Sequence, residues 1–463
     1  MKTWLIVPLL FCIATTSCRP NKEATSSVNQ PTTTAPIAEA VQNDAPDPCT
    51  LALAPHHGDG KIDQQIIRYQ ANIRADKNTF QSVENLGWLY VAKARESFDP
   101  GYYKLAEQCA YCLDAHQPQC AEALLLRGHV LQNLHKFKEA EPLAIELVAK
   151  RGLAFDYGLL GDVFMEQGRL NEAADAYQKM VDQKPDMQAY ARIAYLRWLK
   201  GDLDAAIEIM QLAVSAASPN APESAAWINT RMALLQFQNG NLTQADELCS
   251  AALDYQKDYA PALLLRGRLL LAKDKPTEAV EVLERAEKIN PLPDYQWVLT
   301  EALRADGRIA EADVVAARLN QSGAAADPRT FALYLATHSE KNVLALQLAK
   351  NELAVREDVF THDALAWALA ANGKPADAYQ EIQLALAEGT SDGRLFFHAT
   401  VIAAQAGHTA EALTSLSKTT GMIQLLLPSE KKQFQQATIE LGKSDKVVTT
   451  TGSRTDTIFT ADK

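Results

Sequence analysis

The stretch CAYC, which begins at Cys109, has residue types and a spacing that could carry out chemistry. Two thiols three residues apart are typical of a redox pair, of half a zinc site or of a haem attachment sequence. Leu113 follows the pair where haem attachment requires His, which excludes haem. On a helix, Cys109, Cys112 and His116 would share one face. Cys120 follows the next turn, so a zinc site and a disulfide both remain open at this point.

Other residue combinations that support catalysis or metal binding are absent or weak. The sequence has no phosphate-binding glycine loop, no nucleophile elbow and no HExxH motif. His56 and His57 could ligate a metal together with Asp59, but they precede a helix in a polar turn, where such side chains are usually solvated. The sequence therefore predicts a protein that is not an enzyme and that holds no metal and no cofactor.

The composition indicates which partners to expect. Of the 463 residues, 47% are hydrophobic and 22% are charged, which is ordinary for a soluble protein. The formal net charge of -12 disfavours nucleic acid as a partner, because phosphate contacts need clustered Lys and Arg. The same charge disfavours adsorption to anionic lipid, so contact with a membrane is expected only through an N-terminal lipid anchor.

The N-terminus carries a signal for export. Residues 1–17 contain one Lys, an apolar run and then small residues, which is typical of a secretory signal peptide and too short to span a bilayer. The run ends in TTSC, which resembles a bacterial lipobox with Cys18 as the lipidated residue. By the Gram-negative sorting pattern, Arg19 after this cysteine implies the periplasmic face of the outer membrane. The alternative is ordinary signal cleavage, which would leave a periplasmic or secreted protein.

Farther along, one pattern recurs about every 33 residues: a helix with an apolar face, a turn that contains Gly, and a second helix. In the clearest copy, residues 155–185, Gly161 and Ala173 are small because closely crossing helices leave no room for larger side chains. The pattern resembles the tetratricopeptide repeat (TPR) family of helix-turn-helix units. Taken as markers, the residues at the small position of each first helix give ten copies: Gly87, Gly128, Gly161, Ala194, Ala233, Gly267, Thr300, Leu333, Ala366 and Thr400.

This resemblance implies an all-α fold, a TPR-type helix-turn-helix solenoid wound as a right-handed superhelix of about ten repeats. We expect residues 49–79 to form a helical lead-in, residues 80–426 the repeat array and residues 427–442 a polar capping helix. Residues 18–48, rich in Pro, Thr, Ser and Ala, are expected to form a flexible tether, and residues 443–463 a disordered tail. The cysteine-containing lead-in is similar to that of exported bacterial TPR proteins of uncharacterised function, including lipoproteins.

Aligned on the repeat, CAYC falls inside the second helix of the first copy rather than at a helix N-terminus, where a redox thiolate is stabilised. We therefore interpret it as part of a local disulfide staple in an oxidising compartment. Cys249 takes the place of a buried second-helix residue and is expected to be inert. One or two disulfides are expected, with their pairing left open, among Cys49, Cys109, Cys112 and Cys120.

In TPR proteins the residues that contact ligands form a stripe on the first helix that faces the concave groove. All five Trp of the mature chain fall on this stripe, and Trp and Arg are enriched at binding hot spots. We predict a partner-binding groove that contains Trp88, Tyr195, Trp198, Trp227, Phe237, Arg268, Trp297, Arg304, Trp367 and Phe397. The alternative is that these aromatic side chains pack against neighbouring repeats or inserted loops.

The resemblance implies an adaptor or scaffold in the bacterial envelope that binds a protein or peptide partner in the concave groove. Alternatives from other classes are a glycan- or small-molecule-binding sensor and a non-catalytic accessory subunit of an envelope enzyme or of a secretion or assembly machine. The Lys and Asn clamp with which some TPR co-chaperones hold chaperone tails is not present. The sequence specifies neither the partner nor the oligomeric state.

Overall fold

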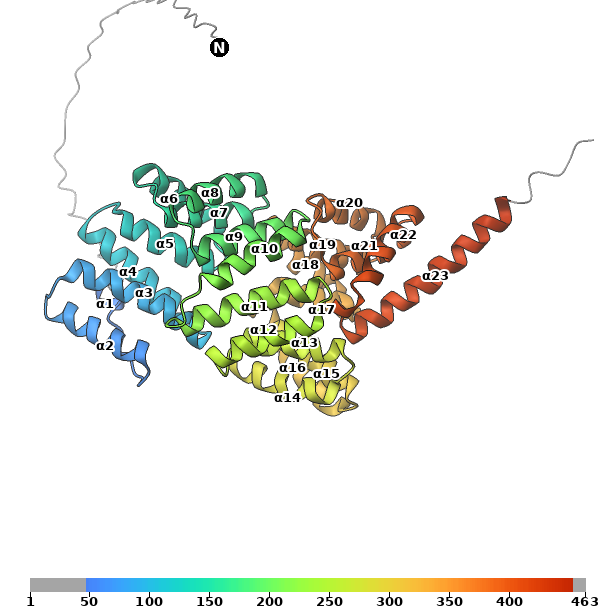
Figure 1. Cartoon of the computed structure of the whole chain (residues 1–463), viewed down its shortest axis with the longest axis horizontal. Helices are drawn as coiled ribbons and strands as arrows, with labels where there is room; N and C mark the ends of the chain where they lie inside the picture. The colour runs from blue at the N-terminus through green and yellow to red at the C-terminus, as the bar shows by residue number, and fades with distance from the viewer. Residues whose placement is uncertain (1–46, 453–463) are drawn as a thin grey trace, which may run out of the picture. The chain divides into compact units, whose positions relative to one another are not determined.

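The structure, a computed structural model, describes residues 47–452, in which all regular structure is helical (Figure 1). The predicted signal peptide at residues 1–17, the lipidation residue Cys18 and nearly all of the predicted tether lie outside the described residues. None of the described helices combines the length and the apolar composition that crossing a membrane requires. Over this part of the chain the predicted all-α fold class is confirmed.

Within the described residues, ten helix pairs follow one another, as the repeat period predicts. The first helices of the pairs are α3 (Thr79–Ser97), α5 (Ala121–Asn133), α7 (Ala154–Glu166), α9 (Met187–Leu199), α11 (Pro222–Gln238), α13 (Ala260–Ala272), α15 (Pro293–Ala305), α17 (Pro328–Thr337), α19 (Val359–Ala371) and α21 (Gly393–Gln405). The second helices are α4 (Gly101–His116), α6 (Phe137–Lys150), α8 (Leu170–Gln183), α10 (Leu203–Ser215), α12 (Leu242–Tyr255), α14 (Pro276–Ile289), α16 (Ile309–Ala326), α18 (Asn342–Leu353), α20 (Pro375–Leu386) and α22 (Thr409–Gly421). The flanking elements are α1 (Pro48–Leu51), α2 (Lys61–Arg74), η1 (Ile423–Leu425) and α23 (Pro428–Gly452).

Close helix crossings explain the residue at the small position of each first helix. All ten marker residues lie on first helices and are buried. A Cβ atom added to Gly161 would lie 2.3 Å from the ring of Tyr177 on α8, and one added to Gly267 would lie 2.4 Å from Leu283 on α14. Because a single pair buries too little apolar surface to be stable alone, the stacking of pair on pair supplies the core.

The last helix is longer than the sequence predicts. We expected a capping helix over residues 427–442 and a disordered tail from residue 443, but α23 continues to Gly452. Gly442 does not end the helix, and no proline follows it before Gly452. Once a helix is nucleated, each further residue adds one hydrogen bond, so the polar continuation needs no core of its own.

The stack of repeats also closes on itself. Three segments in the C-terminal part contact earlier repeats. The hydrogen-bonded and ion-paired residues of these contacts lie 128 to 216 positions apart in the sequence. In the first set, the loop after α18 meets α6 and α7. There Lys138 donates to the carbonyl of Ala354 at 2.8 Å, and the guanidinium of Arg356 lies 3.3 Å from the carboxylate of Glu166. We call these three sets of interactions the closing contacts.

In the second set, the loop between α20 and α21 meets the C-terminal end of α9. The indole N–H of Trp198 donates to the carbonyl of Ser391 at 2.8 Å, and the hydroxyl of Thr390 donates to the carbonyl of Leu199 at 2.5 Å. The side chain of Lys200 forms an ion pair with Glu388 at 3.0 Å. The end of one first helix is therefore covered by a loop almost two hundred residues later in the chain.

In the third set, the segment that contains η1 meets α11, α13 and α15. Arg268 donates to the carbonyl of Leu425 at 3.3 Å. The backbone N–H and the hydroxyl of Ser429 both donate to the carboxylate of Glu301, at 3.0 and 2.6 Å. His338 on the turn after α17 lies 3.1 Å from the same carboxylate. Glu301 thus joins two repeats and the last helix in one polar cluster.

This cluster predicts a pH dependence of stability. Burial lowers the pKa of His338, but the hydrogen bonds to Glu301 and to the carbonyl of Tyr334, together with the charge of Glu301, outweigh burial and raise the pKa above the ordinary 6.5. The contribution of His338 to the free energy of unfolding is therefore fully present below pH 6.5 and is lost as the pH rises through the pKa of the folded state. We expect the difference in unfolding free energy between wild type and His338→Gln to shrink from pH 6 to pH 8. Urea unfolding at each pH measures it, with His57→Gln, at an exposed site, as a control that should show no such trend.

Candidate functional site

Half of the predicted groove residues lie in the core. Trp297 and Phe397 are 0% exposed, and the exposed fractions of Phe237, Trp198 and Trp367 are 1%, 4% and 5%. In an open superhelix these positions would face solvent, but here other parts of the same chain cover them. For these five residues the structure therefore agrees with the alternative interpretation of the sequence, in which the aromatic side chains pack against neighbouring repeats and loops.

Trp297 shows how complete this packing is. Its indole N–H points at Glu301 at 3.4 Å, and its ring meets the edge of Tyr334 at a centroid distance of 5.9 Å. The guanidinium of Arg394 from α21 lies over the ring, 4.8 Å from its centroid. A side chain enclosed on these sides has no free face to offer a partner.

The other five predicted residues remain partly accessible. Trp88 is half-buried against His129, with ring centroids 5.4 Å apart. Arg304 lies 3.5 Å from Asp313 and lines none of the cavities described here. The remaining three, which are half-buried and line cavities among the first helices, are Tyr195, Trp227 and Arg268.

The first cavity, of about 390 Å³, is lined by the first helices α3, α5, α7, α9 and α11 and by Tyr177 of α8. Trp227 and Tyr195 contribute aromatic faces, and Arg231 from α11 lies over the Tyr195 ring at 4.7 Å. Three basic and three acidic side chains complete its polar lining: Arg95, Arg192, Arg231, Asp162, Glu166 and Glu223. The concave face is therefore open here, and it combines aromatic surface with charges of both signs.

Buried hydrogen bonds hold the polar wall of this cavity in place. Arg192 binds Asp162 with two bonds of 2.8 Å, and the hydroxyl of Tyr177 donates to the same carboxylate at 2.7 Å. Burial, together with the positive charges of Arg95 and Arg192, lowers the pKa of His129 to about 4. His129 is therefore neutral at pH 7. The hydrogen bonds of Asp162 to Arg192 and Tyr177 fix the positions of the polar side chains in this wall.

Two more cavities continue along the same concave face. The second, of about 350 Å³, shares Trp227 and Arg231 with the first and extends along α11, α13 and the start of α15. The third, of about 210 Å³, shares Leu234, Arg268 and Asp294 with the second and lies under the closing contacts. The sequence pattern identified aromatic residues and arginines of these cavities but missed the acidic residues that line the first one. Asp162 directly follows the marker Gly161, on the same stripe that holds Arg268 after Gly267, and this spacing could have revealed it.

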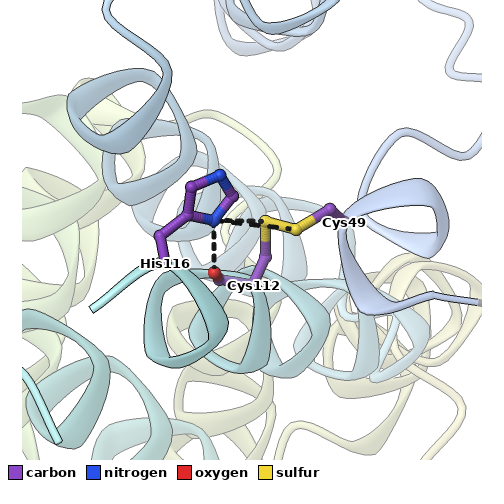
Figure 2. Close-up of side chains that lie close together, drawn as sticks. All are labelled: Cys49, Cys112 and His116. Carbon is purple, nitrogen blue, oxygen red and sulfur yellow. Dashed lines mark hydrogen bonds between the residues drawn. A yellow bond between two sulfur atoms is a disulfide. The ribbon is translucent and has the colours of Figure 1, made fainter. Parts of the chain in front are cut away.

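The cysteine cluster is a disulfide site. Figure 2 shows Cys49 joined to Cys112, with the imidazole of His116 beside the two sulfur atoms. The Nδ1–H of His116 donates to the backbone carbonyl of Cys112 at 2.8 Å, and Nδ1 lies 3.9 and 3.8 Å from the sulfur atoms of Cys49 and Cys112. Because the disulfide uses both sulfurs and the ring nitrogen already donates, these groups do not form the predicted alternative zinc site in this structure. Cys109 and Cys120 are free and buried.

The disulfide predicts a loss of stability on reduction. Since it closes a loop with a sequence separation of 63, the chain-entropy estimate of its contribution is about 4 kcal/mol. We expect Cys49→Ser and reduction of the wild type to lower the unfolding free energy by similar amounts, measured by chemical unfolding. Reduction should leave the Cys49→Ser variant unchanged. Joined Cys49 and Cys112 peptides in a non-reducing digest would verify the pairing, and a different pair would contradict it.

Comparison with known families agrees with the helix pairs. Residues 125–186, 158–222 and 236–306 match sequence patterns described as tetratricopeptide repeat. The chain contains tetratricopeptide repeats. TPR proteins generally mediate protein–protein interactions, and the repeat fold is typically a non-catalytic scaffold. No curated protein matches the chain.

Several solved structures also match this chain, all at low sequence identity. Yeast Tom70 is 15% identical, with 85% of this chain and 96% of that chain covered and a TM-score of 0.35. TTC0263, a TPR protein of Thermus thermophilus, is 21% identical, with 40% and 99% covered and a TM-score of 0.34. A TPR protein from Parabacteroides merdae is 12% identical, with 61% and 98% covered and a TM-score of 0.36.

Proposed function

We propose that this chain is a non-catalytic adaptor that binds a protein or peptide partner at the first cavity. The observation that carries the proposal is an open, aromatic and charged hollow formed by first helices, in a chain whose other predicted groove residues are mostly buried. Trp227 and Tyr195 would contact apolar side chains, while Arg231 and Glu223 would pair with charges of the partner. The buried Trp198 and Trp297 have no part in this binding surface.

Site-specific photocrosslinking in cells that express the full chain tests the proposal. A benzophenone amino acid at Ser224, which lines the first cavity, should form a covalent adduct with one partner protein. The same group at Ser322, exposed on α16, is the matched control and should not form that adduct. Trp227→Ala should abolish the adduct, whereas Arg304→Ala, outside the cavity, should leave it intact. An adduct of equal yield from both positions would count against the first cavity.

The proposed location is the bacterial envelope, with the chain exported and anchored by lipid at Cys18 on the periplasmic face of the outer membrane. The lipobox-like TTSC sequence supports the anchor, and the disulfide between Cys49 and Cys112 supports an oxidising compartment. Incorporation of labelled palmitate that is lost in Cys18→Ser would support the anchor. Export without any label would instead favour a periplasmic or secreted protein.

The cavity volumes favour a second candidate, a sensor for a small molecule. Both the first and the second cavity fall within the range of about 300–1,000 Å³ that is typical of small-ligand pockets. A glycan would stack on Trp227, which lines both cavities. A saturable rise in melting temperature with a defined small molecule, unchanged in Arg304→Ala and lost in Trp227→Ala, would favour this function over protein binding.

A further inference from the structure

Two arginines of the second cavity have no acidic partner. Arg231 on α11 and Arg268 on α13 both line this cavity, and among residues 47–442 neither guanidinium has a carboxylate oxygen within 4.0 Å. Arg231 stacks on Tyr195, which leaves the N–H groups at the rim of its guanidinium available. Arg268 makes one long bond of 3.3 Å to the carbonyl of Leu425, and its buried Nε has no hydrogen-bond partner.

Further positive charge lies beyond Arg268. Arg394 lines the third cavity, on the other side of Arg268, and its Nη2 is buried without a partner, although its Nε lies 2.7 Å from Glu430. Burial and the charge of Arg394 together lower the pKa of Arg268. A guanidinium that forms no ion pair in such surroundings is stabilised by an anion that reaches it, because a buried charge without a direct partner is costly.

A single carboxylate of the protein lines the second cavity. Asp294, near the start of α15, lines the second and third cavities together with Arg268. Among the described side chains it forms no ion pair within 4.0 Å and accepts no hydrogen bond from another side chain. Its charge balances only one of the two arginines of the second cavity, so that cavity has an excess of one positive charge.

The rest of the cavity wall is apolar apart from Thr230. Its aromatic and aliphatic members are Trp227, Leu234, Tyr259, Pro261, Leu264 and Leu265. The cavity of about 350 Å³ thus combines a cationic side with an apolar remainder. Such a combination matches a ligand that carries one negative charge on an apolar group.

We propose that the second cavity binds an amphiphilic carboxylate, with its apolar group against Trp227 and Leu264 and its carboxylate held by Arg231 and Arg268. Arginine is suited to this contact because its planar guanidinium can donate two parallel hydrogen bonds to a carboxylate. The ligand can be a free acyl chain or a peptide whose last residue is apolar, since both end in the same group. The inference goes beyond the proposed adaptor function, because it needs no partner protein in the first cavity, and it names a ligand class for the second candidate, the small-molecule sensor.

Calorimetric titration of the full chain tests this proposal, with Cys18→Ser so that no lipid is attached. The probes are octanoate, N-acetyl-dileucine with a free carboxylate, the amide of the same dipeptide, and 1-octanol. One or both carboxylates should bind with one site per chain. Each neutral probe should bind at least about tenfold more weakly than the matching carboxylate, as expected for loss of a charged hydrogen bond. The carboxylate that binds more tightly identifies the source, an acyl chain or a peptide end.

Variants at the two charged positions make the test specific. Arg268→Gln should weaken carboxylate binding about tenfold or more, while Arg304→Gln, outside the cavity, should not change it. Asp294→Asn should tighten binding severalfold, a gain that misfolding cannot imitate. The proposal is overturned if neither carboxylate binds, if the neutral probes bind as tightly, or if Asp294→Asn fails to tighten binding. None of these results bears on the adduct at Ser224, so the two proposals fail separately.

Discussion

Replacing Trp297 by alanine is expected to lower the free energy of unfolding by about 3–5 kcal/mol, the range for removal of a fully buried large side chain. The side chain is 0% exposed, and its loss would leave a cavity between α15 and α17 that rigid helices cannot fill. It would also remove the ring beneath the guanidinium of Arg394. Guanidinium chloride unfolding, followed by circular dichroism, measures the change.

Trp227→Ala is the matched control for this prediction. Trp227 is also a first-helix tryptophan on the predicted stripe, but it is half-buried and lines two cavities. Replacing Trp227 should lower the free energy of unfolding clearly less than replacing Trp297 does, and it should weaken partner binding instead. Equal losses of stability in the two variants would contradict the distinction between a core tryptophan and a site tryptophan.

Replacing Gly201 by alanine is expected to break the second set of closing contacts. Gly201 has φ +81°, and an added Cβ would lie 2.5 Å from the backbone carbonyl oxygen of Gly389. An alanine in this left-handed conformation costs about 1–2 kcal/mol by itself. The clash with backbone atoms must in addition displace the loop that binds Trp198 and Leu199, at about 1 kcal/mol for each hydrogen bond lost.

Gly307→Ala separates these two effects. Gly307 occupies the equivalent turn after α15 with φ +80°, but an added Cβ would have no atom within 4 Å. It should therefore show only the cost of the left-handed conformation. We expect Gly201→Ala to lose about 2 kcal/mol more than Gly307→Ala in chemical unfolding. Matching losses would show that the loop between α20 and α21 does not rest on this turn.

The repeat pattern was predictable because its cause is local. Gly161 and Gly267 must be small where two adjacent helices cross, and adjacent helices are close in sequence, so a single copy contains the signal. Closing contacts have a different origin. They depend on the small rotation between successive repeats, which accumulates over about half of the array before Trp198 meets Ser391. The sequence of a single repeat does not determine this accumulated rotation.

The site was predictable only in part for the same reason. The stripe on the first helices was identified, and Tyr195, Trp227 and Arg268 do line cavities. Whether a given position of the stripe faces solvent or a distant loop depends on the closure, so Trp297 could not be told from Trp227 by spacing alone. The partner of Cys112 was likewise undetermined, because sequence does not fix which of several cysteines meet in space.

The disulfide between Cys49 and Cys112 also determines how the body carries mechanical load. For a chain held at its N-terminal end, as proposed, a pulling force enters at Cys49 and passes through the sulfur atoms directly into the C-terminal half of α4. The intervening helices α2 and α3 lie within the covalent loop and bear none of this tension. Forced unfolding of the oxidised protein should therefore release about 200 Å less chain than that of the reduced protein, at roughly 3.3–3.6 Å per residue over the separation of 63.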